Sequence, residues 1–399
     1  MDPIGLERLA ELAVTVGANV QPGQIVAVEA EVGKEAAARA VAAAAYRRGA
    51  KFVDVSYFDP HVKLARLELA ADETLAFVPS WYGAKALALG EERAALVALR
   101  GPAEPGILDG VDPARAGRDQ LPSVKERLAV LAARKVNWTA LPVPTPGWAR
   151  RVHPALAPET AFERLWEELT HLLRLDEPDP AGAWRERLTG LSAIGGRLTA
   201  LRLDAVRFEG PGTDLTVGLL PSSRWLSAGG FTTVDGIEHV PNLPTEEVFT
   251  APDPERADGI VRATRPLELA GTIIRDFTVR FEGGRAVEIE GAAGAGALRA
   301  RAALDEGACR LGEVALVDRE SRVGRLGTIF SETLIDENAV SHIAIGMAYP
   351  FCVGDDDLGR VNSSFTHVDF MVGGDEVEVT GITPAGERLP LLRRGEFVA

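Results

Sequence analysis

The first half of the chain alternates between helical and strand-like hydrophobic patterns. Apolar residues recur at helical spacing over residues 6–16, and an Ala-rich helix is predicted at residues 33–48. Short apolar runs at residues 25–28 and 52–55 flank that helix and predict strands. A strand, a helix and a second strand in this order imply a parallel βαβ unit with a right-handed crossover.

The second half has a different pattern. An amphipathic helix at residues 160–175 is followed by a run rich in Pro and acid at residues 176–183, which marks a domain boundary. Beyond residue 199, short runs alternate apolar with polar residues, as half-buried strands do. The strands predicted there cover residues 200–203, 206–208, 214–217, 277–281 and 287–290. We therefore predict an α/β domain at residues 1–190 and a β-rich α+β domain at residues 191–399.

Composition narrows the class of protein. The chain has 399 residues, 46% hydrophobic and 25% charged, which is typical of a globular protein with sizeable cores. Its formal net charge of −15 argues against a nucleic-acid partner, because phosphates require a basic surface. Cys309 and Cys352 provide no disulfide framework, which fits a reducing cytoplasm. No export signal and no apolar run of about 18 residues is present, so we expect a cytoplasmic protein without a membrane span.

A nucleotide cofactor is not expected in the N-terminal half. The loop after the first predicted strand, residues 29–33, has acids where a phosphate would lie. It also lacks the Gly-rich fingerprint that brings backbone N–H groups up to a phosphate. The candidate chemistry lies instead near the C-terminus.

A strand predicted at residues 364–372 carries the first candidate ligands. His367 and Asp369 are two residues apart, so their side chains share one face of that strand. An imidazole beside a carboxylate suits a divalent cation. The alternative is a surface pair in which Asp369 merely orients His367.

Further acids and an imidazole lie in three other segments. Glu313 stands in the apolar run 311–317, where a buried carboxylate is costly unless it is paired or bound to a metal. Alternatively, Glu313 lies at a strand end in solvent. Glu337 and His342 are five residues apart, which places them at an element boundary rather than on one helix face.

The acidic pair Glu246 and Glu247 lies in a loop that enters a strand, so we expect one side chain to face inward and the other outward. Which of the two faces inward stays open on the residues alone. Tyr349 precedes Pro350 and therefore lies on a constrained turn. Its alternative role is ring packing with the hydroxyl in water.

Four motifs in this order, NLPTEEVFTAP, LGEVALV, DENAVSHIAIGMAY and THVDFMVG, resemble the thermophilic aminopeptidase family, the M29 metallopeptidases. The likeness extends over essentially the whole chain. It implies a dimeric, metal-dependent aminopeptidase with two cations in each active site. The metal ligands that the resemblance implies are Glu247, Glu313, Glu337, His342, His367 and Asp369, and the active-site tyrosine is Tyr349.

The predicted function is release of N-terminal residues from short peptides by a water that two divalent cations activate. The cations are Zn²⁺, Co²⁺ or Mn²⁺, all of which accept carboxylate and imidazole ligands. Glu313 is a bridging ligand, the general base or both, and Tyr349 is expected to donate a hydrogen bond to the oxyanion. The alternatives are a metal-dependent esterase or amidase acting on non-peptide substrates, and a non-catalytic metal-binding protein.

Other acids and histidines are given structural roles. Residues 355–357, three consecutive Asp, are expected to form a solvated loop because Gly lies close on both sides. His61, His153 and His171 have no acid cluster at ligand spacing and are interpreted as surface or structural residues. His239 precedes the NLPTEEVFTAP motif and is a candidate for the substrate site.

Overall fold

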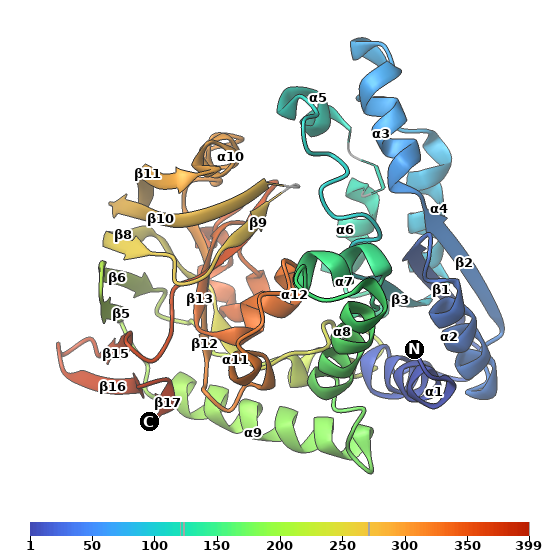
Figure 1. Ribbon diagram of the computed structural model, residues 1–399. Helices are drawn as coiled ribbons and strands as arrows, with labels where there is room; N and C mark the ends of the chain where they lie inside the picture. The colour runs from blue at the N-terminus through green and yellow to red at the C-terminus, as the bar shows by residue number, and fades with distance from the viewer. Residues whose placement is uncertain (120, 123, 270–271, 399) are drawn as a thin grey trace. The chain divides into compact units, whose positions relative to one another are not determined.

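A computed structural model describes residues 1–119, 121–122, 124–269 and 272–398 (Figure 1). Its contacts divide the chain into two compact units. The N-terminal unit comprises Met1–Arg185 and Gly229–Pro244, and the C-terminal unit comprises Glu186–Ala228 and Thr245–Ala399. The boundary at residues 190 and 191, as a division between independently folding domains, stays a proposal.

A parallel sheet in the order β2-β1-β3-β4 forms the centre of the N-terminal unit. Its strands are β1 (Ile25–Glu31), β2 (Phe52–Phe58), β3 (Ala95–Arg100) and β4 (Asn137–Pro142). Between β1 and β2 lies α2 (Glu35–Arg47), whose buried residues are alanines and Val41. Gly49 follows the helix with φ 90°, a conformation that suits glycine at a helix C-terminus. The predicted parallel βαβ unit is confirmed.

Further helices precede β1, connect these strands or follow β4. They are α1 (Pro3–Leu12), η1 (Ala13–Gly17), α3 (Pro60–Leu69), η2 (Asp72–Thr74), α4 (Ser80–Glu91), α5 (Pro113–Arg118), α6 (Lys125–Ala132), α7 (Pro146–Val152) and α8 (Pro158–Leu172). Among the residues that the structure describes, no helix combines the length and the apolar character that a membrane crossing requires.

Two sheets make up the C-terminal unit, which α9 (Pro180–Ala200) leads into. The larger sheet has the order β11-β10-β8-β6-β5-β15-β16-β17, and β9 pairs with β10. Its strands are β5 (Ala205–Gly210), β6 (Thr213–Leu219), β8 (Pro252–Arg262), β9 (Leu267–Leu269), β10 (Thr272–Glu282), β11 (Arg285–Ala293), β15 (Glu378–Ile382), β16 (Arg388–Arg393) and β17 (Glu396–Phe397).

The smaller sheet is antiparallel and has the order β14-β13-β12-β7. Its strands are β7 (Glu247–Thr250), β12 (Leu311–Val317), β13 (His342–Gly346) and β14 (His367–Met371). The remaining helical segments are η3 (Ala228–Gly230), α10 (Ala295–Ala302), α11 (Arg322–Leu326), α12 (Thr333–Asp336), η4 (Glu337–Ala339), η5 (Pro350–Cys352) and η6 (Asp355–Arg360). The mixed α/β fold class expected from the sequence is confirmed.

One predicted strand, residues 200–203, is wrong. Helix α9 continues to Ala200, and Arg202 then adopts φ 45°, which extended strand backbone does not allow. The other four strands predicted in this half lie within β5, β6, β10 and β11.

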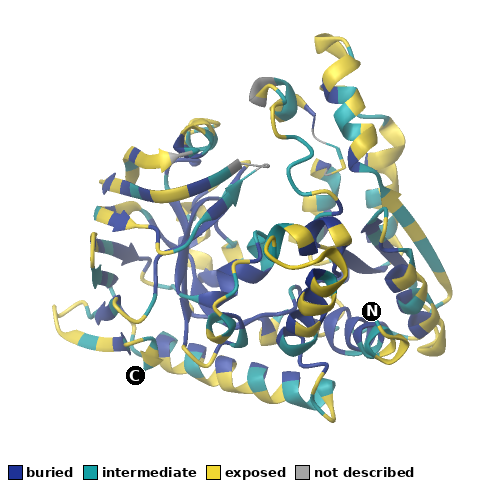
Figure 2. Ribbon diagram, viewed as in Figure 1, coloured by how far each residue is buried: buried dark blue, intermediate teal, exposed yellow. Residues whose placement is uncertain are grey.

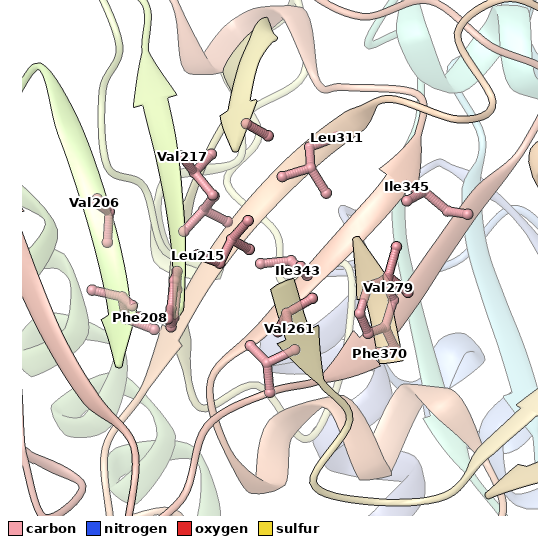
Figure 3. Packing of buried hydrophobic residues seen from close by; sticks show 14 of the residues in the cluster. Val206, Phe208, Leu215, Val217, Val261, Val279, Leu311, Ile343, Ile345 and Phe370 are labelled. Atoms are coloured by element: carbon pink, nitrogen blue, oxygen red, sulfur yellow. The ribbon is translucent and has the colours of Figure 1, made fainter. Parts of the chain in front are cut away.

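The two sheets of the C-terminal unit share one apolar core. From the smaller sheet, Leu311, Ile343 and Phe370 point into it, and the larger sheet contributes Phe208 and Val279 (Figure 3). Strands β12 and β13 are buried along their whole length (Figure 2). Because strand side chains alternate between faces, the odd-numbered residues of β12 from 313 onward, the odd-numbered residues of β14 and the even-numbered residues of β13 lie on the face away from this core.

Candidate metal centre

The centre of the smaller sheet brings two predicted ligands together across one residue of β13. Ala344 pairs with Glu313 of β12 on one side and with Asp369 of β14 on the other. His342 and His367 lie on the same face, two residues from Ala344 and from Asp369 respectively. Glu247 begins β7, the strand on the other side of β12.

A β-bulge turns Glu313 toward this face. Leu311 and Glu313 are two residues apart and would share a face in a regular strand. The register shifts between them, so Leu311 enters the apolar core while Glu313 joins the ligands. Gly312 lies between them, where a Cβ atom would come within 2.3 Å of the Gly346 carbonyl oxygen. The bulge therefore requires glycine at residue 312.

The donor atoms form two groups that share Glu313. His342 Nε2 lies 3.0 Å from Glu247 Oε2 and 3.8 Å from Glu313 Oε1. His367 Nε2 lies 3.1 Å from Asp369 Oδ1 and 3.5 Å from Glu313 Oε2. In each group the three donor atoms lie within 4.8 Å of one another, which is compact enough for one ion.

Glu337 belongs to the same electrostatic cluster but to neither group of three. It begins η4 and is buried. Burial raises its pKa well above the ordinary value, and the charges of Asp369 and Glu247 add to that effect. The sixth predicted ligand is therefore a buried carboxylate whose charge interacts with those of Asp369 and Glu247.

The pKa values show an excess of negative charge in the cluster. Burial lowers the pKa of His342, but the carboxylate of Glu247, 3.0 Å away, outweighs this effect and leaves that pKa well above the ordinary value. At His367, burial also lowers the pKa, and Asp369 outweighs it, so the value rises to about 10. Burial raises the pKa of Glu313 as well. Divalent cations would supply the positive charge that protons supply here.

The residues present fit divalent cations in two further respects. Glu247 Oε2 and His342 Nδ1 are buried and have no well-directed hydrogen-bond partner among the described residues, despite the short Nε2–Oε2 approach. The residues between the donors on the sheet face are small, namely Ala315, Ala344 and Gly346. None of these three residues has a side chain larger than a methyl group, and the oxygen and nitrogen donors around them suit Zn²⁺, Co²⁺ or Mn²⁺.

A hydrogen bond to the backbone orients the ring of His367. His367 Nδ1 lies 2.8 Å from the Met347 carbonyl oxygen, so an Nδ1–H donates to it and Nε2 faces Glu313 and Asp369. This arrangement, with one ring nitrogen held by the backbone, is common for metal-binding histidines.

Tyr349 lies beside the cluster in an aromatic group. Its ring stacks on Phe351 at 5.2 Å and lies 5.6 Å from the ring of His367 and 6.1 Å from that of Phe249. Burial, with the charge of Glu313 adding to it, raises the pKa of Tyr349 well above the ordinary value. The phenol therefore stays protonated and is able to donate a hydrogen bond.

The expectation for the acidic pair was half wrong. Both glutamates avoid solvent: the side chain of Glu247 is 13% exposed and that of Glu246 is 0% exposed. Glu246 accepts a hydrogen bond of 2.6 Å from Arg187 of α9, which compensates its charge. The sequence analysis did not single out Arg187. The residues around it in α9 give no indication that its partner is Glu246, which lies in a distant segment of the chain.

The solvated loop expected at residues 355–357 was also partly wrong. Asp357 is buried and accepts hydrogen bonds from Ser222 and Arg360, so it fastens this segment to the C-terminal unit.

Among the histidines outside the cluster, His153 pairs with Glu168 and His171 with Asp176. His239 belongs to the N-terminal unit, and its role in a substrate site stays a prediction.

A cavity of about 680 Å³ in the C-terminal unit is separate from this cluster. Its lining includes Arg265, Ser341 and Gly373 but none of the six predicted ligands. The candidate chemistry therefore does not coincide with this cavity.

Comparison with known proteins gives a consistent result. The sequence model of the family described as thermophilic metalloprotease (M29) matches residues 4–397. Aminopeptidase T of Thermus thermophilus is 43% identical over 98% of this chain and 98% of its own length. Aminopeptidase 2 of Geobacillus stearothermophilus is 36% identical over 98% of this chain and 97% of its own.

Two solved structures share the fold. Wild-type AmpT from Thermus thermophilus matches with a TM-score of 0.91 and 42% identity, covering 99% of both chains. A 2,5-dihydroxypyridine dioxygenase from Pseudomonas putida KT2440 matches with a TM-score of 0.54 and 15% identity, covering 99% of this chain and 97% of its own. At 15% identity, the second likeness shows a shared fold and does not indicate a shared reaction.

The family match and the aminopeptidase names of the relatives define the class as a metal-dependent hydrolytic enzyme. The chain belongs to the thermophilic metalloprotease (M29) family. The resemblance seen in the four motifs is thereby confirmed, as is the prediction of an enzyme that hydrolyses peptide bonds.

Proposed function

We propose that this protein is a metal-dependent aminopeptidase that releases N-terminal residues from short peptides through a water activated by two divalent cations. The observation that carries the proposal is the position of Glu313, which directs one carboxylate oxygen toward each of two donor groups. The names of the relatives, aminopeptidase T and aminopeptidase 2, support the substrate class.

The proposed ligands divide between two positions. Glu247 and His342 would hold one cation, His367 and Asp369 would hold the other, and Glu313 would bridge them. Glu337 would add a carboxylate to the shell. When bound, two cations lower the pKa of a shared water and polarise the scissile carbonyl. Carboxylate and imidazole donors accept Zn²⁺, Co²⁺ or Mn²⁺.

The chain's own groups would complete the site. The protonated phenol of Tyr349 would donate a hydrogen bond to the oxyanion that develops on the substrate. His367 would keep its orientation through the Met347 carbonyl oxygen. The aromatic group around Tyr349 would exclude water from one side of the centre.

A digest of a peptide library, read by mass spectrometry after metal reconstitution, tests this function. The expected result is stepwise trimming from the N-terminus. Amino-acid p-nitroanilides should be cleaved, and their N-blocked versions should not, because an aminopeptidase requires the free amine. Equal cleavage of both would indicate an esterase or amidase instead, and tight metal binding without turnover would indicate a non-catalytic protein.

The location of the protein in the cell and its oligomeric state also belong to this proposal. We propose that the protein is a cytoplasmic homodimer, as the motif likeness and the absence of a disulfide framework support. Light scattering on the active enzyme is the measurement, and a fully active monomer would contradict the dimer.

A further inference from the structure

Arg187 joins two buried carboxylates at one end of the smaller sheet. Its Nε donates to Glu246 Oε2 over 2.6 Å. Its Nη2 donates to Asp318 Oδ1 over 3.0 Å, and its Nη1 to Asp318 Oδ2 over 3.3 Å. All three side chains are largely buried, with exposures of 16% for Arg187, 0% for Glu246 and 9% for Asp318.

These carboxylates are attached to the strands that carry proposed ligands. Glu246 directly precedes Glu247, the first residue of β7, and Asp318 directly follows Val317, the last residue of β12. Glu247 and Val317 are paired across the two strands. Arg187 therefore closes the end of the β7–β12 pair, at the position where Glu247 reaches toward His342.

Strand β7 needs such a fastening because it is short and lies at the edge of its sheet. It has four residues and pairs with β12 along one side, and on the other side Phe249 forms an isolated bridge with Leu226. A second fastening comes from Asn338, whose Oδ1 accepts a hydrogen bond of 2.6 Å from the Glu246 backbone N–H. Asn338 follows Glu337, so the segment that holds Glu247 is also tied to the segment that holds Glu337.

The guanidinium of Arg187 forms an ion pair with the side chain of Glu246, whereas the side chain of Glu247 approaches His342. Without the guanidinium of Arg187, the buried carboxylate of Glu246 would lose the ion pair shown here, next to the proposed ligand Glu247. Removing one partner of a buried ion pair leaves an uncompensated buried charge, which is unfavourable. Because Glu246 directly precedes Glu247, its carboxylate would then compete with Glu247 for the cation that Glu247 and His342 would hold.

We propose that Arg187 is a positioning residue that selects Glu247, rather than Glu246, as the metal ligand and holds β7 in register with β12. This proposal rests on the metal-dependent function proposed above. Arg187 acts through Glu246 and Asp318 and would not touch substrate or metal. Its loss should therefore weaken cation binding at the Glu247–His342 position more than at the His367–Asp369 position.

Competition titration of the metal-free protein against a chromophoric chelator, with Zn²⁺ and Co²⁺, tests the proposal. Arg187→Met removes the charge while keeping most of the length. We expect one of the two cations to bind about 10–100-fold more weakly, the range found when contacts behind a metal ligand are removed. Arg187→Lys should recover part of the lost affinity, because an ammonium keeps the positive charge but lacks the planar set of donors of a guanidinium.

The matched control is Arg207→Met. Arg207 also donates two hydrogen bonds to one carboxylate, that of Asp214, but in the larger sheet, which does not include β7, and its loss should leave both affinities unchanged. A second variant, Arg187→Met with Glu246→Gln, removes the carboxylate that would compete with Glu247. It should bind the weaker cation more tightly than Arg187→Met alone does.

The outcomes separate this proposal from the proposed function. A wild-type protein that binds no divalent cation would contradict the function itself. Wild-type affinity in folded Arg187→Met would overturn the positioning role alone, and so would a fall in the unfolding temperature of the metal-free protein without any change in affinity. If Arg187→Met does not fold, Arg187→Lys and Glu246→Gln keep part of the pair, and the same affinity comparison applies to them.

Discussion

Glu313 on β12 and Asp369 on β14 lie opposite the same residue of β13, Ala344, one from each side. The two carboxylates are therefore held on one sheet face, two strands apart, although they are distant in sequence. On the intervening strand, the side chain between them is the single methyl group of Ala344. Several properties of the protein depend on this arrangement.

Metal removal should abolish peptide hydrolysis, and Co²⁺, Zn²⁺ or Mn²⁺ should restore it. Removal should also lower the unfolding temperature, because the buried carboxylates then repel one another. A cation at about 100 times its Kd adds about 2.7 kcal/mol to the free energy of unfolding. The measurements are peptide turnover and calorimetry before and after chelation. Full activity in a verified metal-free sample would contradict the prediction.

Ala344→Val should weaken cation binding by at least about tenfold, because a branched side chain would occupy the space between Glu313 and Asp369. Ile343→Val is the control on the opposite face, where it borders the apolar core. That control should reduce the free energy of unfolding by about 0.5–1.5 kcal/mol and leave cation binding intact. Cation titration measures the affinity of both variants, and denaturant unfolding measures their free energy of unfolding.

Glu313→Gln should lose both cations as well as activity. The reason is that Glu313 faces both donor groups, and the neutral amide is a poor substitute for a bridging carboxylate. Metal analysis beside kinetics is the measurement. If the variant keeps both cations and loses only kcat, Glu313 acts as a general base without bridging.

Tyr349→Phe should lower kcat by about 10²–10³ while the metal content stays unchanged. The substitution removes the proposed hydrogen bond to the oxyanion and keeps the ring contacts with Phe351 and His367. Steady-state kinetics and metal analysis on the same preparation are the check. An unchanged kcat would remove Tyr349 from the mechanism.

Acid should destabilise the N-terminal unit through His239. Burial lowers the pKa of His239 from 6.5 to about 4, and its Nε2 has no hydrogen-bond partner among the described residues. Above pH 6.5 both the folded and the unfolded states are neutral at this residue. Between pH 6.5 and 4 the unfolded state gains a proton that the folded state does not, so stability falls by an amount on the order of 3 kcal/mol.

Denaturant unfolding of the metal-free protein at pH 7.5 and pH 5 measures this effect without interference from cation loss. His239→Leu removes the titrating group among the rings of Trp138 and Phe231 and should show a smaller loss of stability between the two pH values. An equal loss in the variant and the wild type would assign the acid sensitivity to other groups.

The pattern of residues along the chain determined several features correctly. Alternation over residues 364–372 placed His367 and Asp369 on one face, because a strand repeats every two residues whatever its neighbours are. The Ala-rich pattern after β1 predicted α2 and the parallel pairing of β1 with β2. The four motifs were sufficient to recognise the family, and therefore the chemistry, because each carries residues of the proposed centre.

Tertiary structure decided the features that depend on contacts between distant segments. The direction of Glu313 depends on a bulge against β13, and period-two alternation alone would have placed Leu311 and Glu313 on the same face. The burial of Glu246 depends on Arg187, which arrives from a helix far along the chain. A local pattern gives the period of a strand, but strand order, register shifts and charge partners follow from long-range packing. These contacts determine which of the chain's acids lie together at the centre.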